Sequence, residues 1–136
     1  MSASERKIRV LIAKVGLDGH DVGARVIARG LLDAGMEVIY TGVRRTPEQV
    51  VRAALEEDVD VVGVSILSGA HLTLLPRLRR LLDEGNAKDI GLIAGGVIPQ
   101  EDIGPLKDAG VTEVFLSGTT VHDIVNHILE RYGDRT

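Results

Sequence analysis

Short apolar runs alternate with longer amphipathic runs along the whole chain. Each apolar run is bounded by polar or glycine-rich residues and is short, which is typical of strands buried on both faces. These predicted strands cover residues 7–13, 37–42, 60–67, 90–96 and 113–118. The amphipathic runs place apolar residues at helical spacing and cover residues 22–35, 46–58, 72–85, 99–110 and 120–133. Five successive βα units predict a parallel sheet covered by helices on both faces.

The number and order of these units favour one α/β domain with a flavodoxin-like (Rossmann-like), doubly wound sheet. Strands of such sheets commonly follow the order 2-1-3-4-5, so the winding direction reverses between the first and third strands. A crevice then opens at the carboxyl ends of those strands, where open α/β sheets bind ligands. The chain length suits a single domain over residues 1–136, with an ordered core at about 7–132.

Charge and composition remove several classes of function. The net charge is −4 with acidic and basic residues interspersed, so the chain lacks the basic face that nucleic-acid binding needs. It contains no cysteine, which excludes disulfides, thiolate metal sites and cysteine nucleophiles. No apolar run resembles a secretory signal or approaches the length of a membrane span. We therefore expect a cytoplasmic protein with neither a nucleic-acid nor a membrane partner.

The two loops richest in chemical groups lie at the predicted crevice. The segment KVGLDGHDVG (14–23) follows the first strand, and SILSGAH (65–71) ends the third. His20 could be an acid–base group, a phosphate contact or a metal ligand. Asp18 is placed to accept the second ring N–H of His20, as carboxylates do for metal-bound histidines. One histidine and one aspartate are too few for an ordinary zinc site, so a metal here would bring its other ligands, as in a macrocycle.

Two motifs in these loops and a third at the end of the fourth strand carry a resemblance to a known family. They are D-x-H-x-x-G at Asp18, His20 and Gly23, S-x-L at Ser65 and Leu67, and a glycine pair at Gly95 and Gly96. From about Ile8 to Arg131 the chain resembles the B12-binding domain of the methylmalonyl-CoA mutase family, including the stretches EDVDVVGVSILSGAHLTLLP and IAGGVIP. The motifs fall in the loops where the fold alone predicts a ligand site.

The resemblance implies a role for each motif. His20 would bind the cobalt of cobalamin in place of the cofactor's own benzimidazole, and Asp18 and Lys14 would complete the axial-ligand relay. The displaced benzimidazole tail would enter the crevice. No residue of the chain would be catalytic by itself. Asp21, one of the implied contacts, would also suit the N-cap of the first helix. The implied cofactor contacts are Asp18, Gly19, His20, Asp21, Gly23, Ser65, Leu67, Ser68, Gly95, Gly96, Gly118 and Thr119.

The same resemblance implies an activity that needs a second chain. The cofactor would be adenosylcobalamin, and the chain would be the small subunit of an acyl-CoA carbon-skeleton mutase, an isomerase of the intramolecular transferase class. A large (β/α)8-barrel subunit would hold the substrate in a heterotetramer, and a G-protein chaperone is a further expected partner. The isolated chain would show no mutase activity. The substrate could be methylmalonyl-CoA or 2-hydroxyisobutyryl-CoA.

One departure and several alternatives stay open. Relatives in this family often carry F-G-P-G-T after the fifth strand, whereas this chain has FLSGTT at 115–120. The departure favours the 2-hydroxyisobutyryl-CoA hypothesis and leaves the outer contacts of the tail open. A corrinoid methyl carrier and a glutamate-mutase-type small subunit are alternative functions, and a receiver-like regulatory module is the non-enzyme alternative. His71 is either a contact to the corrin or a partner, or a polar loop residue, while His122 and His127 are expected on the surface or in the packing of the last helix.

Overall fold

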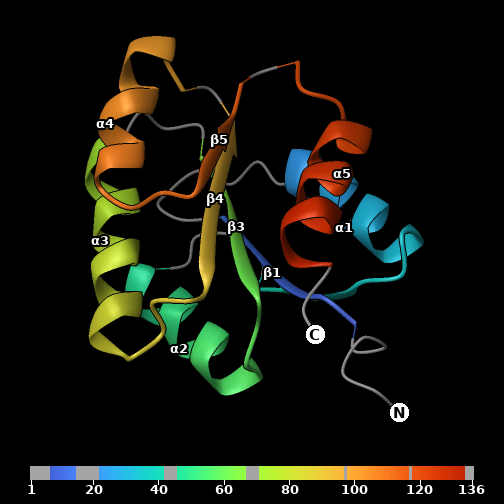
Figure 1. Cartoon of the computed structure of the whole chain (residues 1–136), viewed down its shortest axis with the longest axis horizontal. Coiled ribbons are helices and arrows are strands. Elements are labelled where there is room, and N and C mark those ends of the chain that lie inside the picture. The colour runs from blue at the N-terminus through green and yellow to red at the C-terminus, as the bar shows by residue number, and fades with distance from the viewer. Residues whose placement is uncertain are drawn as a thin grey trace.

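A central parallel sheet lies between two layers of helices (Figure 1). This computed structural model describes residues 7–14, 22–41, 46–66, 71–96, 98–116 and 118–133. The strands are β1 (Arg9–Lys14), β2 (Glu37–Tyr40), β3 (Val61–Ile66), β4 (Gly91–Gly96) and β5 (Glu113–Phe115). The helices are α1 (Val22–Asp33), α2 (Pro47–Glu57), α3 (His71–Glu84), α4 (Ile103–Asp108) and α5 (Val121–Tyr132), with a 3-10 turn, η2, at Gln100–Asp102.

The strand order confirms the predicted fold. It is β2-β1-β3-β4-β5, and every neighbouring pair is parallel. The winding direction therefore reverses between β1 and β3, which is where the sequence predicts a crevice. None of the helices in the described part of the chain is long and apolar enough to cross a membrane.

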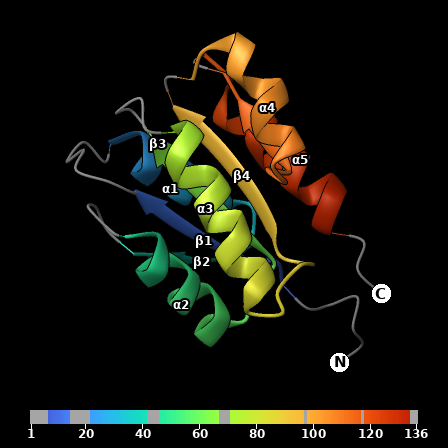
Figure 2. The ribbon, with the colours of Figure 1, turned by 90° about the vertical axis from the view of Figure 1, so that its left-hand side faces the viewer.

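Each face of the sheet has its own apolar core. Helices α1 and α5 cover one face, and α2, α3 and α4 cover the other (Figure 2). The first core contains Val10, Ile12, Val61, Ile93, Ala28, Leu31, Ile124 and Ile128. The second contains Leu11, Val62, Val64, Leu92, Val50, Leu75, Leu78 and Leu106. Alternate residues of one strand thus enter opposite cores, which explains why the strands read as continuous apolar runs.

The start of α2 follows directly from local sequence. The Thr46 hydroxyl oxygen accepts the Gln49 N–H at 3.1 Å, and the Gln49 side-chain oxygen accepts the Thr46 N–H at 2.9 Å. Pro47 occupies the first helical position, where its missing N–H costs nothing. This capping box begins the helix at the residue that the sequence predicts.

Several element boundaries differ from the prediction. Strand β2 ends at Tyr40 and β5 ends at Phe115, both earlier than predicted. Leu116, directly after β5, is apolar but lies outside the sheet and is 40% exposed. Helix α3 begins at His71, which the sequence analysis placed in the preceding loop. The predicted helix over 99–110 is split into η2 and the short α4, since it contains a glycine and a proline, both weak helix formers.

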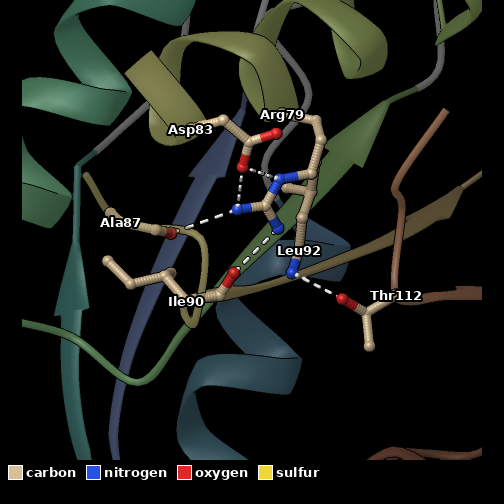
Figure 3. Close-up of polar contacts among 6 residues, drawn as sticks. All are labelled: Arg79, Asp83, Ala87, Ile90, Leu92 and Thr112. Atoms are coloured by element: carbon tan, nitrogen blue, oxygen red, sulfur yellow. Dashed lines mark hydrogen bonds and ion pairs between the residues drawn. The ribbon is translucent and has the colours of Figure 1, made fainter. Parts of the chain in front are cut away.

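A buried arginine fixes the connection between α3 and β4 (Figure 3). The Arg79 guanidinium donates to the carbonyl of Ile90 at 2.8 Å and to that of Ala87 at 3.1 Å, and it pairs with Asp83 at 2.9 Å. The Arg79 side chain is only 9% exposed, so its charge would be costly to bury without these partners. The clamp joins α3 to the segment that leads into the amino end of β4.

Candidate functional site

The carboxyl ends of four strands line up in two rows across the sheet. The outer row consists of Lys14 in β1, Ser65 in β3, Gly95 in β4 and Phe115 in β5, each paired in register with the next. Two residues earlier in each strand, the inner row consists of Ile12, Gly63, Ile93 and Glu113. Both rows belong to the face covered by α1 and α5, because side chains two residues apart in a strand share a face.

A cavity of about 370 Å³ lies over these rows, and we call it the sheet pocket. Its floor is formed by the residues of both rows except Glu113. Its other walls are Ala24 and Ile27 of α1, Ile124 of α5, and Leu116, Gly118 and Thr119 between β5 and α5. The sequence predicts a crevice between the first and third strands, whereas the sheet pocket extends further, across β4 to β5.

Two glycines lie in the floor of the sheet pocket. A Cβ atom built on Gly95 would have the Phe115 carbonyl oxygen as its nearest neighbour, at 3.8 Å, so a side chain there would occupy pocket space without a clash. A Cβ on Gly63 would lie 3.0 Å from the Ile12 side chain, which is a tight contact. Glycine in a strand interior often marks a place where a ligand approaches the backbone closely. The floor is therefore suited to a planar group lying against the sheet.

Two polar side chains stand side by side in the outer row of this otherwise apolar floor. Lys14 is only 1% exposed, and Ser65 in the neighbouring strand is partly exposed. Lys14 is also the last residue of β1, directly before the segment that carries Asp18 and His20. A few placed polar groups in an apolar pocket orient a ligand.

The corner at the end of β4 requires glycine. Gly96 has a φ of +122°, a conformation that side-chain-bearing residues rarely adopt. A Cβ atom on Gly96 would also clash with the carbonyl oxygen of Ile66 at the end of β3. The ends of β3 and β4 are thus in backbone contact beside the sheet pocket.

Leu116 and Thr119 of the FLSGTT segment are hydrogen-bonded to each other beside the sheet pocket. The N–H of Thr119 donates to the Leu116 carbonyl at 3.0 Å, and its hydroxyl donates to the same oxygen at 2.7 Å. Gly118, directly before Thr119, has a φ of +94°. Thr120 then caps α5 by accepting the Asp123 N–H at 3.1 Å. The departure from F-G-P-G-T therefore still presents Gly118 and Thr119 to the pocket.

Two β5 residues at this end of the floor, Phe115 and Glu113, contact side chains of α5 and α4. The Phe115 ring meets the His127 ring edge to face, with centroids 5.3 Å apart. Burial opposes ionisation of the Glu113 carboxyl. Hydrogen bonds from Lys107 and from the Val114 N–H outweigh that effect and hold the Glu113 pKa below its ordinary value of 4.5.

Half of the predicted cofactor contacts can be placed. The sheet pocket brings together Lys14, Ser65, Gly95, Gly96, Gly118 and Thr119. Gly23 lies in the first turn of α1. The remaining predicted contacts, Asp18, Gly19, His20, Asp21, Leu67 and Ser68, lie outside the described residues. Within the described ranges, no three histidine, aspartate or glutamate side chains are close enough together to hold a metal ion.

The sequence analysis missed part of the pocket floor. Gly63 lies in the strand predicted over 60–67 and is absent from the predicted contacts, although a glycine inside a Val-rich strand is itself a signal of close approach. Phe115 is the only phenylalanine of the chain and also lines the pocket. His122 is exposed on α5, with Asn126 as its neighbour at 3.0 Å.

Comparison with known families agrees with this geometry. The model of the B12 binding domain matches residues 8–126. The chain belongs to the B12-binding domain family. This membership confirms the resemblance drawn from the three motifs, and it fits a fold whose pocket lies at the carboxyl ends of the strands.

Relatives within the family include free-standing small subunits. The 2-hydroxyisobutanoyl-CoA mutase small subunit of Aquincola tertiaricarbonis is 57% identical over 121 residues, which cover 89% of each chain. The pivalyl-CoA mutase small subunit of Xanthobacter autotrophicus is 45% identical over 90% of this chain and 82% of its own. The methylmalonyl-CoA mutase large subunit of Streptomyces virginiae is 44% identical over 95% of this chain, which spans only 18% of that relative.

A solved structure shares the fold. A cobalamin-binding protein from Desulfitobacterium hafniense superimposes with a TM-score of 0.79 over 92% of this chain and 59% of its own, at 23% identity. At 23% identity this comparison shows a shared fold and nothing further.

Proposed function

We propose that the chain is the cobalamin-binding small subunit of an adenosylcobalamin-dependent acyl-CoA mutase that acts on 2-hydroxyisobutyryl-CoA. Family membership and 57% identity to a 2-hydroxyisobutanoyl-CoA mutase small subunit over most of both chains support this proposal. The FLSGTT departure in the sequence points the same way. The observation that carries the proposal is the sheet pocket, with its glycine-lined floor at the carboxyl ends of β1, β3, β4 and β5.

The sheet pocket suits the nucleotide tail of a corrinoid. The base of that tail is a planar, mostly apolar benzimidazole. The missing side chain at Gly95 leaves space for such a ring against the backbone, and Phe115 closes one end of the floor. The Ser65 hydroxyl, in the outer row, would donate a hydrogen bond to the ring nitrogen that cobalt no longer occupies. Gly118 and Thr119 would lie beside the sugar phosphate.

In this proposal residues after β1 would hold the metal of the cofactor. His20 would bind cobalt through one ring nitrogen, and Asp18 would accept the other ring N–H, which would fix the tautomer and orientation of the imidazole. Lys14, buried at the end of β1, would steady the Asp18 carboxylate. Bound adenosylcobalamin supplies a cobalt–carbon bond that can break homolytically. The chain itself anchors, orients and ligates.

The acyl-CoA substrate would be held by a second chain. In the proposed complex a large (β/α)8-barrel subunit binds the thioester and completes a heterotetramer, with a G-protein chaperone as a further partner. The small subunit alone should then give no turnover. Mixing it with the large subunit of a 2-hydroxyisobutyryl-CoA mutase and with that of a methylmalonyl-CoA mutase distinguishes the two substrates, because only the matching pair should restore activity.

The decisive experiment is an absorption titration with adenosylcobalamin in the dark. We expect the wild-type chain to give the spectrum of a corrinoid whose benzimidazole is displaced and whose cobalt is bound by a histidine. His20→Ala should abolish the histidine-bound spectrum. His122→Ala removes an exposed histidine on α5 and is the matched control. A wild-type complex in which the benzimidazole stays on cobalt would refute the proposal.

A further inference from the structure

A buried histidine and an aspartate are joined across two neighbouring connections at the carboxyl edge of the sheet. The Nε2 atom of His71, the first residue of α3, lies 2.8 Å from Oδ2 of Asp102, the last residue of η2. The His71 side chain is 6% exposed and that of Asp102 is 21% exposed. The pair therefore connects the segment after β3 to the segment after β4, in a setting largely shielded from water.

Asp102 does not use its carboxylate for local capping, and the second ring nitrogen of His71 has no partner among the described residues. Asp102 stands at the N-cap of α4, where a carboxylate usually accepts a backbone N–H, yet its side chain makes no capping bond. On His71, the Nδ1 atom is buried and has no hydrogen-bond partner among the described residues. When Nε2–H donates to Asp102 in the neutral ring, Nδ1 is an open acceptor. Local helix capping therefore does not account for the pair.

The position of the pair relates it to the sheet pocket. His71 comes five residues after Ile66, and Asp102 comes six residues after Gly96. Ile66 and Gly96 are already in backbone contact, since a Cβ on Gly96 would clash with the Ile66 carbonyl. The two connections are thus joined at their beginning by that contact and at their end by the pair. The strand ends from which they leave contribute Ser65, Gly95 and Gly96 to the sheet pocket.

We propose that His71 and Asp102 are a positioning pair that holds the β3–β4 end of the pocket floor in its ligand-binding geometry. The inference rests on the proposed function, because the ligand it concerns is the nucleotide tail of a corrinoid. The strands are paired up to Ile66 and Gly96, and the hydrogen bond between His71 and Asp102 holds the two connections together beyond that last pair. Loss of the bond lets this end of the floor relax, so the tail is bound less tightly while the fold persists.

The test measures the Kd for adenosylcobalamin and the urea unfolding of the ligand-free chain for the same set of variants. His71→Leu and Asp102→Ala should each weaken binding about 10-fold, the scale seen when a positioning partner of a binding group is removed. The double variant should be no weaker than either single one, since both remove the same contact. His71→Gln places an amide N–H where Nε2–H was, and it should restore binding to within about 3-fold of wild type.

Arg79→Met is the matched control, because it breaks the buried clamp at the other end of the same helix. It should lower the free energy of unfolding and leave the Kd within about 2-fold of wild type. That change is well below the roughly 10-fold loss expected for His71→Leu. The inference is overturned if His71→Leu leaves the Kd unchanged, if Arg79→Met weakens binding equally, or if His71→Gln fails to restore it. A wild-type chain that does not bind adenosylcobalamin would instead overturn the proposed function, and this inference with it.

Discussion

Replacing Gly95 by alanine should move stability and ligand affinity in opposite directions. Gly95 lies in the outer row of the pocket floor, and its φ is not in the left-handed region. The new methyl group would meet its nearest protein atoms at 3.8 and 4.0 Å, which is ordinary contact distance. The ligand-free protein therefore accepts the side chain without strain, and the methyl group takes space from the pocket.

The size of both effects follows from this geometry. Alanine in place of glycine inside a strand should raise the free energy of unfolding by about 0.5–1 kcal/mol, because the unfolded chain loses conformational freedom. With the tail bound, the same methyl group overfills a packed site, at a cost of about 1–3 kcal/mol. That cost corresponds to a Kd for adenosylcobalamin roughly 5- to 150-fold higher.

The assay pairs urea unfolding of the ligand-free chain with absorption titration of adenosylcobalamin. Gly104→Ala in α4 is the matched control, because its Cβ would have no atom within 4 Å and Gly104 does not line the pocket. It should leave the Kd unchanged, and it should change stability little, because the freedom lost by the unfolded chain is offset by the crowding of a side chain directly before Pro105. Equal affinity of the wild type and Gly95→Ala would refute the placement of the tail over this floor.

Two further predictions concern stability. Arg79→Met keeps the aliphatic stem and leaves two buried carbonyls without their charged donors, so the free energy of unfolding should fall by about 3 kcal/mol in urea titrations; a loss below about 1 kcal/mol would contradict the clamp. Burial opposes ionisation of Glu113, yet Lys107 and a backbone N–H hold the pKa of its carboxyl below 4.5. The ionised carboxylate therefore stabilises the folded state fully above pH 4.5, and this stabilisation is lost as the pH falls through the lowered pKa. The stability difference between wild type and Glu113→Gln should therefore shrink in acid, and a difference that stays constant down to about pH 3 would show that the Lys107 contact is not maintained.

The architecture could be predicted because the signals for it are local and repeated. Each strand is a continuous apolar run, since its alternate residues enter two different cores. The TPEQ sequence defines the start of α2 through a capping box between Thr46 and Gln49. The order of the strands then followed from the number of βα units. The end of β5 could not be predicted, because exposed Leu116 and the strand residues Val114 and Phe115 are all apolar.

The site was predictable only where a motif marked it. Ser65, Gly95 and Gly96 carry family motifs and line the pocket. The partner of His71 could not be found from sequence, because Asp102 lies 31 residues further along and nothing local connects the two. The histidine was expected in a loop, yet it opens a helix and is buried. Contacts of this kind arise when the chain folds back on itself, so the local sequence around either residue does not indicate them.

The lengths of the outermost strands bear on how copies of this chain behave toward one another. The sheet ends in β2, with four residues, on one side and in β5, with three, on the other. Edge strands this short expose few unpaired backbone N–H and C=O groups, and each of the two strands begins with a glutamate. A strand of a neighbouring molecule can therefore form few hydrogen bonds with either edge, and concentrated samples should resist β-type aggregation while the fold is intact.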